Sequence, residues 1–361
     1  MRYTVARASK AGLHRKEGPK TLAIGQPNWL VLATMLLLLV TAVACARQAT
    51  PTPQPAPTPV PTQAKVAPIP DSARGPTIDP AKGYVVQEIK DGLYWVTDGT
   101  YQVMFLQSGR GVVAVDAPPS LGDKYLKAIA EVTNEPVTHV IYSHSNKDHI
   151  GAASMFPKEA VFIASEETAA QLAQANDPNR PLPTVKFKDT YTLRVGNQTL
   201  ELAYKGPAHE PGNIFIYAPK QKVLMLVDVI FPGWTPFKSL AVAEDTRAYI
   251  QAHEQVLAYD FDTFIGGHVG RLGTRQDVET QREYIRDIQA NAAAALKSVD
   301  FSAVAQKTGF DNPWLLFDTY LNTVAKACAD ATVPKWTGRL AAADVFTFDH
   351  CFKIMESLRI D

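Results

Sequence analysis

The sequence has few cysteines and no excess of either charge. Its 361 residues include only three cysteines, which excludes a disulfide-dense scaffold, and their spacing does not match a zinc finger. The 36 basic and 36 acidic side chains give a formal net charge of zero at pH 7, whereas a protein that mainly binds nucleic acid needs a basic excess. Hydrophobic residues make up 46 % of the chain, so it can bury a sizeable core and is not disordered throughout.

Charge is missing altogether from one stretch near the N-terminus. Residues 29–44 read WLVLATMLLLLVTAVA, and the segment before them holds six basic residues and a single acid, Glu17. A basic start, an apolar run and small residues before a cleavage point are typical of an export signal. Because Cys45 follows directly, residues 1–44 resemble a bacterial lipoprotein signal sequence, which implies that Cys45 is lipidated after cleavage.

An uncleaved membrane anchor is the alternative, since sixteen apolar residues fall just short of the ~17–25 that span a bilayer. In either case the basic end stays inside, so we expect the rest of the chain at the outer face of the cytoplasmic membrane. Eight of the twenty residues at 51–70 are proline. This composition predicts that residues 45–82 form an extended, disordered linker rather than a domain.

Residues 83–297 have the pattern of an α+β domain. Short alternating runs between residues 84 and 117 predict four strands, and residues 121–132 have helical spacing. The continuous apolar run at 137–143 predicts a buried strand. These elements would form a first sheet with a covering helix.

A second set of strand-like runs lies between residues 160 and 228, followed by a helix at 246–259 and a strand at 262–265. Two sets of strands with intervening helices predict two sheets covered by helices. From residue 275 the pattern is almost wholly helical, and residues 298–361 are predicted to be a C-terminal helical extension.

Side chains that bind metal ions gather directly after the predicted buried strand, in the segment HSNKDH. It contains His144, Asp148 and His149. His209 and His268 lie in glycine-containing loops, and Asp228 ends an apolar run. Imidazole and carboxylate together suit zinc, with iron or manganese as alternatives. The sequence therefore predicts a metal site at a shared edge of the strands.

These motifs, in this order, resemble those of metallo-β-lactamase fold hydrolases. The resemblance covers about residues 83–297 and implies a four-layer αββα sandwich with a dinuclear metal site between its sheets. The HxHxDH motif and the later family ligands align with His144, Asn146, Asp148, His149, His209, Asp228 and His268. The early strand-ending acid of the family aligns with Asp116, which implies a supporting place behind the ligands. An Asp at position 228 is typical of the glyoxalase- and lactonase-like branches, whereas the zinc β-lactamases use Cys there.

The chain departs from the family pattern at Asn146, where the family has a second His. The resemblance implies a first metal on His144, Asn146 and His209, a second on Asp148, His149 and His268, and a bridging Asp228. Because an amide oxygen is a poorer zinc ligand than imidazole, the first site is expected to be weak. Three outcomes are open. The protein works with one metal at the second site, it holds two metals because Asp228 and a water compensate, or it binds metal poorly and has lost hydrolysis. Asn146 could instead contact substrate through its amide N–H.

The function that the resemblance implies is hydrolysis of an ester, lactone, thioester or amide in a small-molecule substrate. The metal would generate the nucleophile from water, and Asp148 would orient that water and take up its proton. The alternative is a metal, redox or binding protein of the same fold that does not hydrolyse anything. Retention of Asp148, His149, Asp228 and His268 favours the enzyme, whereas Asn146 favours the alternative.

Two further regions carry open expectations. The aromatic segment 231–237 follows Asp228 and would form either an apolar substrate lip or loop packing. Arg271 and Arg275 would meet an anionic substrate or solvate a helix start. Cys328 and Cys351 lie in the helical extension, and outside the cytoplasm we expect them to form a disulfide, with two buried free thiols as the alternative.

Overall fold

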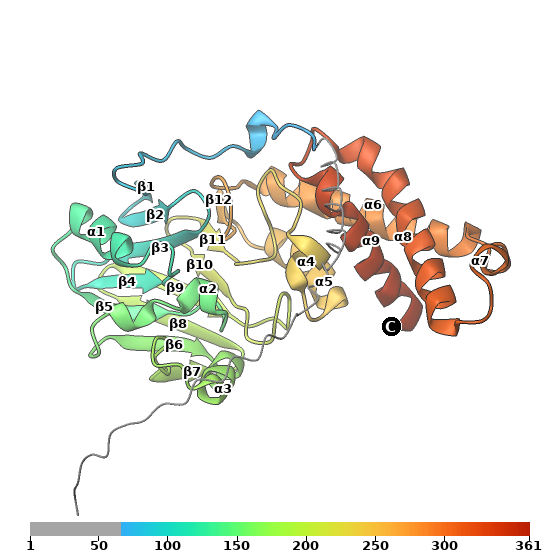
Figure 1. The fold of residues 1–361 in the computed structure, drawn as a ribbon. Helices are drawn as coiled ribbons and strands as arrows, with labels where there is room; N and C mark the ends of the chain where they lie inside the picture. Colours follow the sequence, from blue (N-terminus) through green and yellow to red (C-terminus); the bar gives the residue numbers. More distant parts are fainter. Residues whose placement is uncertain (1–65) are drawn as a thin grey trace, which may run out of the picture. The chain divides into compact units, whose positions relative to one another are not determined.

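A computed structural model describes residues 66–361 of the chain (Figure 1). The expected signal sequence, Cys45 and most of the proline-rich linker lie outside the described residues. Within residues 66–361, no helix is both long enough and apolar enough to cross a membrane.

The first sheet has seven strands in the order β1 to β7. Strands β1 to β4 pair antiparallel, and β4 to β7 pair parallel. The strands are β1 (Val85–Lys90), β2 (Leu93–Thr97), β3 (Gln102–Gln107), β4 (Val112–Val115), β5 (Val137–Ile141), β6 (Val161–Ser165) and β7 (Val185–Phe187). The helices between them are α1 (Asp123–Val132), α2 (Lys147–Ile150) and α3 (Glu166–Ala175).

The second sheet has five strands in the order β12-β11-β10-β9-β8. Strands β8 to β11 form an antiparallel run, and β12 pairs parallel with β11. The strands are β8 (Thr190–Val195), β9 (Gln198–Ala203), β10 (Phe215–Ala218), β11 (Val223–Met225) and β12 (Thr263–Ile265). Between β11 and β12 run α4 (Lys238–Val242) and α5 (Thr246–Leu257).

The core of the domain lies between the two sheets. Side chains alternate across a strand, so β3 sends Met104 and Leu106 toward the second sheet and Val103 and Phe105 toward α1. Residues of both sheets meet in one buried cluster, and each outer face is covered by helices, with α1 on the first sheet and α5 and α6 on the second. The layers are therefore α-β-β-α, as predicted.

The C-terminal region is helical and includes α6 (Arg275–Ser298), α7 (Phe301–Thr308), α8 (Pro313–Trp336) and α9 (Ala343–Ile360). Figure 1 shows α6, α8 and α9 packed side by side. Helix α6 begins with a capping box in which the side chains of Thr274 and Asp277 satisfy each other's backbone N–H groups. Cys328 of α8 and Cys351 of α9 form a disulfide between two buried positions, the pairing expected from the sequence.

Candidate metal centre

The candidate ligands come from chain segments that leave the strands at one edge of the two sheets. His144 follows β5, and His149 lies on the short helix α2. Asp228 follows β11, and His268 follows β12. His209 lies in the loop between β9 and β10, where the Asn213 amide donates to the Val227 carbonyl at 3.0 Å and ties this loop to the end of β11. Parallel pairing of β11 with β12 therefore brings Asp228 and His268 together from distant parts of the chain.

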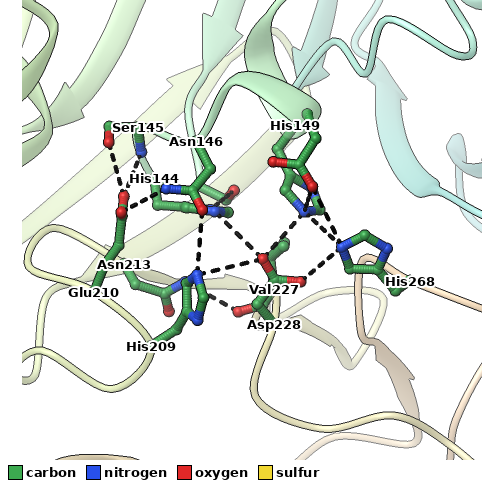
Figure 2. Close-up of polar contacts among 12 residues, drawn as sticks. His144, Ser145, Asn146, His149, His209, Glu210, Asn213, Val227, Asp228 and His268 are labelled. Carbon is green, nitrogen blue, oxygen red and sulfur yellow. Dashed lines mark hydrogen bonds and ion pairs between the residues drawn. The ribbon is translucent and has the colours of Figure 1, made fainter. Parts of the chain in front are cut away.

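Asp228 lies at the centre of four imidazole rings (Figure 2). Its Oδ2 atom is 3.4 Å from Nε2 of His144, 3.1 Å from Nε2 of His149 and 3.6 Å from Nε2 of His209. Its Oδ1 atom is 3.0 Å from Nε2 of His268. The side chains form two donor groups, one of His144, His209 and Asp228 and one of Asp148, His149 and His268. The second group has the three members expected from the sequence, and the first combines two of the expected ligands, His144 and His209, with Asp228, which was expected as a bridge.

The donor spacing fits metal ions. Four donors at about 2.1 Å from a tetrahedral zinc ion are about 3.4 Å apart. In the second group, Nε2 of His149 and Nε2 of His268 lie 3.6 Å and 3.7 Å from Oδ2 of Asp148. Nε2 of His144 is buried without a hydrogen-bond partner, while its Nδ1 faces the Ser143 hydroxyl at 2.9 Å. One ring nitrogen is thus held by the protein and the other is left as a ligand, the arrangement typical of metal-binding His.

The neighbouring imidazole rings keep the Asp228 side chain in its ionised, negatively charged form. Burial raises the pKa of a carboxyl, but attraction from His149, His144 and His268 outweighs it and holds the pKa of Asp228 well below its usual range. Burial lowers the pKa of an imidazole, yet the attraction of the nearby Asp228 carboxylate outweighs it and raises the pKa of His144 to about 9. The pKa of His268 is raised against burial in the same way. Burial dominates at His209 and lowers its pKa. An ionised carboxylate among imidazoles draws positive charge to this point, as a cation site requires.

Known proteins are similar to this chain over the part that contains the candidate ligands. Residues 96–268 match the model of the metallo-β-lactamase superfamily, and the matched segment runs from β2 to the candidate ligand His268. The protein has the metallo-β-lactamase fold. A double mutant of the sec-alkyl sulfatase PisA1 has a similar fold, with a TM-score of 0.55 at 15 % identity. That match covers 76 % of this chain and 50 % of the sulfatase chain.

Two relatives are similar in sequence. The 2,4-dinitroanisole O-demethylase subunit alpha of Nocardioides sp. is 27 % identical over 234 residues, which cover 61 % of this chain and 69 % of that protein. The metallo-beta-lactamase type 2 of Elizabethkingia meningoseptica is 25 % identical over 153 residues, which cover 39 % of this chain and 59 % of that protein. The chain thus spans only part of the length of each relative.

Asp116 is buried beside the candidate metal centre. It follows β4 with a φ of 60°, and its Oδ1 accepts the backbone N–H of Ser143 at 2.8 Å. Asp228 also has a positive φ, 64°. Asp is one of the few residues that tolerate this left-handed conformation. Burial raises the pKa of Asp116 despite its His neighbours. Its hydrogen bond fixes the backbone that carries His144.

Two residues of the site were missed in the sequence analysis. Glu210 is buried and binds Ser145 and Asn146, and its only signal was its place directly after His209. The Tyr101 hydroxyl donates to Oδ2 of Asp148 at 3.2 Å, and the ring lies 4.6 Å from the ring of His268. Burial, followed by the charge of Asp148, raises the pKa of Tyr101 to about 12. Tyr101 therefore stays a hydrogen-bond donor at neutral pH.

The segment 231–237 is packed against the rest of the protein over most of its length. Phe231 is buried, with its ring 6.2 Å from that of His268, and the Trp234 indole donates to the Ala73 carbonyl at 2.9 Å. Phe237 is exposed at the other end and contacts Phe346 of α9 edge-on. The first part of the segment packs the site, and its end remains open to solvent.

Neither arginine near His268 is left free for a substrate. Arg271 donates to both oxygens of Asp277, at 3.0 Å and 2.6 Å, and to the Ser72 carbonyl. Arg275 donates to the carbonyls of Leu257 and Tyr259 at the C-terminal end of α5 and lies over the ring of Phe261. The structure assigns both side chains to packing around the start of α6.

Proposed function

We propose that the protein is a metal-dependent hydrolase that uses activated water to cleave an ester, lactone, thioester or amide bond in a small-molecule substrate. The single observation that carries the proposal is the pair of donor groups on either side of Asp228. The metallo-β-lactamase fold supports it, because members of this superfamily are typically hydrolases. Asp228 in place of Cys supports a relation to the glyoxalase- and lactonase-like branches.

The residues fit two ions, with zinc as the first choice and iron or manganese as alternatives. A bound ion of this kind supplies a Lewis acid and makes water nucleophilic near neutral pH. The first would be held by His144, His209 and Asn146, the second by Asp148, His149 and His268, with Asp228 shared between them.

Asp148 is the residue we assign to proton transfer. Its side chain is 46 % exposed, so a substrate can reach it. The Tyr101 hydroxyl occupies its Oδ2 atom, which leaves the other oxygen to orient the attacking water and accept its proton. Tyr101 also packs on His268 and keeps this ring and the carboxylate in a fixed relation.

The test is a panel of ester, lactone, thioester, amide and β-lactam substrates, extended to 2,4-dinitroanisole because of the O-demethylase relative. We expect turnover that is lost with a chelator and restored by one metal. Asp148→Asn and His268→Ala should abolish it without unfolding the domain. Chelator-resistant turnover, or full activity in both variants, contradicts the proposal.

A metal or binding protein without hydrolytic activity is the second candidate, and Asn146 is the residue that favours it. Such a protein would bind metal in the second group but would turn over none of the substrates. Metal content measured on the same preparation separates the two cases, because an inactive protein with bound metal supports the second candidate alone.

We also propose that the enzyme acts outside the cytoplasm, held at the membrane by a lipid on Cys45 or by an uncleaved anchor. The support is the apolar segment 29–44 and the proline-rich spacer after it. Membrane fractionation of the full chain and of Cys45→Ala tests this. Release of the variant to the soluble fraction indicates lipidation, continued retention indicates an anchor, and a soluble wild-type protein contradicts both.

A further inference from the structure

Glu210 is a buried carboxylate that the chemistry described above does not use. Its side chain lies beside the HSNKDH segment, and the residue is only 7 % exposed. Its Oε1 atom accepts the backbone N–H and the hydroxyl of Ser145, both at 2.9 Å. Its Oε2 atom accepts the side-chain amide of Asn146 at 2.5 Å. A carboxylate is costly to bury, so such a group needs a reason to be kept there.

The carboxylate determines which way the amide of Asn146 points (Figure 2). A carboxylate only accepts hydrogen bonds, so Asn146 must turn its NH₂ group toward Glu210. Its Oδ1 atom then points the opposite way and lies 3.3 Å from Nε2 of His209. That separation matches the distance of about 3.4 Å between donors around a tetrahedral zinc ion.

The amide oxygen therefore completes a donor set. Oδ1 of Asn146 lies 3.3 Å from Nε2 of His209, which itself belongs to the donor group with His144 and Asp228. Within that group, Oδ2 of Asp228 is 3.4 Å from Nε2 of His144 and 3.6 Å from Nε2 of His209. The opposite amide orientation would place NH₂ hydrogens there, and these cannot bind a cation.

We propose that Glu210 is a positioning residue that makes Asn146 an oxygen ligand of the first metal. It orients the amide, and its negative charge polarises the amide so that Oδ1 becomes a stronger donor. The Asn in the motif is then a functional substitution that depends on Glu210. This inference rests on the proposed function only in assuming that the first donor group binds metal.

Glu210→Gln tests the orientation directly. The Gln oxygen can keep its bonds to Ser145, but its NH₂ group then faces the NH₂ group of Asn146. Asn146 relieves this by rotating its amide, which removes Oδ1 from the metal position. We expect the first-site affinity for Co²⁺ and Zn²⁺ to fall by roughly 10–100-fold, measured by chelator competition and by visible absorption of the Co²⁺ protein.

A compensating variant keeps the test valid if Glu210→Gln is poorly folded. In Asn146→Asp with Glu210→Gln, the new carboxylate can accept the Gln NH₂ group with one oxygen and face the metal with the other. The net charge of the pair is unchanged. We expect the double variant to regain at least tenfold in first-site affinity over Glu210→Gln.

Glu135→Gln is the matched control. Glu135 accepts backbone N–H groups of Ser108, Gly109 and Gly111 in the turn before β4, at the end of that strand remote from Asp116. The Glu135→Gln variant should keep the wild-type Co²⁺ absorption and the wild-type affinity for Co²⁺ and Zn²⁺. In an Asn146→Ala background, Glu210→Gln should weaken the first site no further, because there is no amide left to position.

The outcomes separate this inference from the proposed function. If wild-type protein binds two metals and Glu210→Gln binds them equally well, Glu210 has no positioning role, although the metal site stands. The inference also fails if the double variant remains as weak as Glu210→Gln. If wild-type protein binds no transition metal, the proposed function itself fails.

Discussion

Nε2 of His149 lies 2.9 Å from Nε2 of His268, although 119 positions separate the two residues in the sequence. His149 lies on α2 beside the first sheet, and His268 follows the last strand of the second sheet. Asp148 faces both rings through its Oδ2 atom. The site therefore forms only when the two sheets pack against each other.

Asp148 and Tyr101 should differ in their effects on turnover. Asp148→Asn removes both a donor to metal and the proton acceptor, so we expect kcat/KM to fall by about 10³-fold or more. Tyr101→Phe removes only the hydrogen bond to Oδ2 and keeps the ring on His268, so the loss should be about tenfold. Steady-state kinetics on metal-loaded protein measures both. Equal losses would contradict the roles assigned here.

Stability should fall with acid because of buried neutral histidines. Burial lowers the pKa of His350 from 6.5 to about 4, and its ring nitrogens face the Tyr284 hydroxyl and the Phe237 carbonyl. The unfolded chain takes up this proton below pH 6.5, whereas the folded protein resists until about pH 4. The stability that depends on neutral His350 is therefore fully present above pH 6.5, and it is lost as the pH falls toward 4.

From pH 7.5 to pH 5 this one group should cost about 2 kcal/mol in the free energy of unfolding. His253, whose pKa burial also lowers to about 4, adds a similar amount. Urea unfolding of His350→Gln should show a weaker pH dependence by about 2 kcal/mol. An unchanged dependence would show that His350 does not resist protonation in the folded state.

Helix α4 contains a left-handed turn without glycine. Ser239, Leu240, Ala241 and Val242 have φ values from 53° to 58°, which cost about 1–2 kcal/mol each for L-residues. Val242 is 63 % exposed, so Val242→Gly loses little burial and should raise the free energy of unfolding by about 1 kcal/mol.

The matched control for that prediction is Val345→Gly in the right-handed helix α9, where Val345 is 42 % exposed. It should lower the free energy of unfolding by about 1 kcal/mol. The same sign for both changes would mean that α4 is not left-handed in solution.

The disulfide between α8 and α9 should stabilise the helical extension. It closes a loop with a sequence separation of 23, which corresponds to about 3 kcal/mol in the chain-entropy account. Replacing Cys328 and Cys351 by Ala should reduce stability by about this amount. Peptide mapping after alkylation without reduction should find both thiols blocked, and alkylated Cys328 or Cys351 would contradict the pairing.

Much of the fold was readable from the sequence because its periodicities are strong. The alternating runs that became β1 to β4 and the apolar run that became β5 needed no tertiary information. The three-residue strand β7 and helix α4 were missed, since Val185–Phe187 is too short to show alternation and Lys238–Val242 has no glycine to mark its positive φ values. Helix α3 was also missed, although Ser165 caps it.

Some residues of the site could be predicted from the sequence and others could not. His144, Asp148 and His149 carry a local motif, so sequence sufficed to select them. Glu210 and Tyr101 act through contacts with residues 64 and 47 positions away, and no local pattern marks such partners. Arg271 shows the converse, because a charge beside the motif turned out to pair with Asp277.

The central claim is that Asp228 and the residues around it form a dinuclear metal site. The most direct measurement is the metal content of the purified protein, determined by mass spectrometry after zinc supplementation and removal of free metal. We predict about two equivalents for the wild type, and about one for His268→Ala, which retains the first donor group. Less than half an equivalent of transition metal in the wild type, or an unchanged content in the variant, would contradict the account.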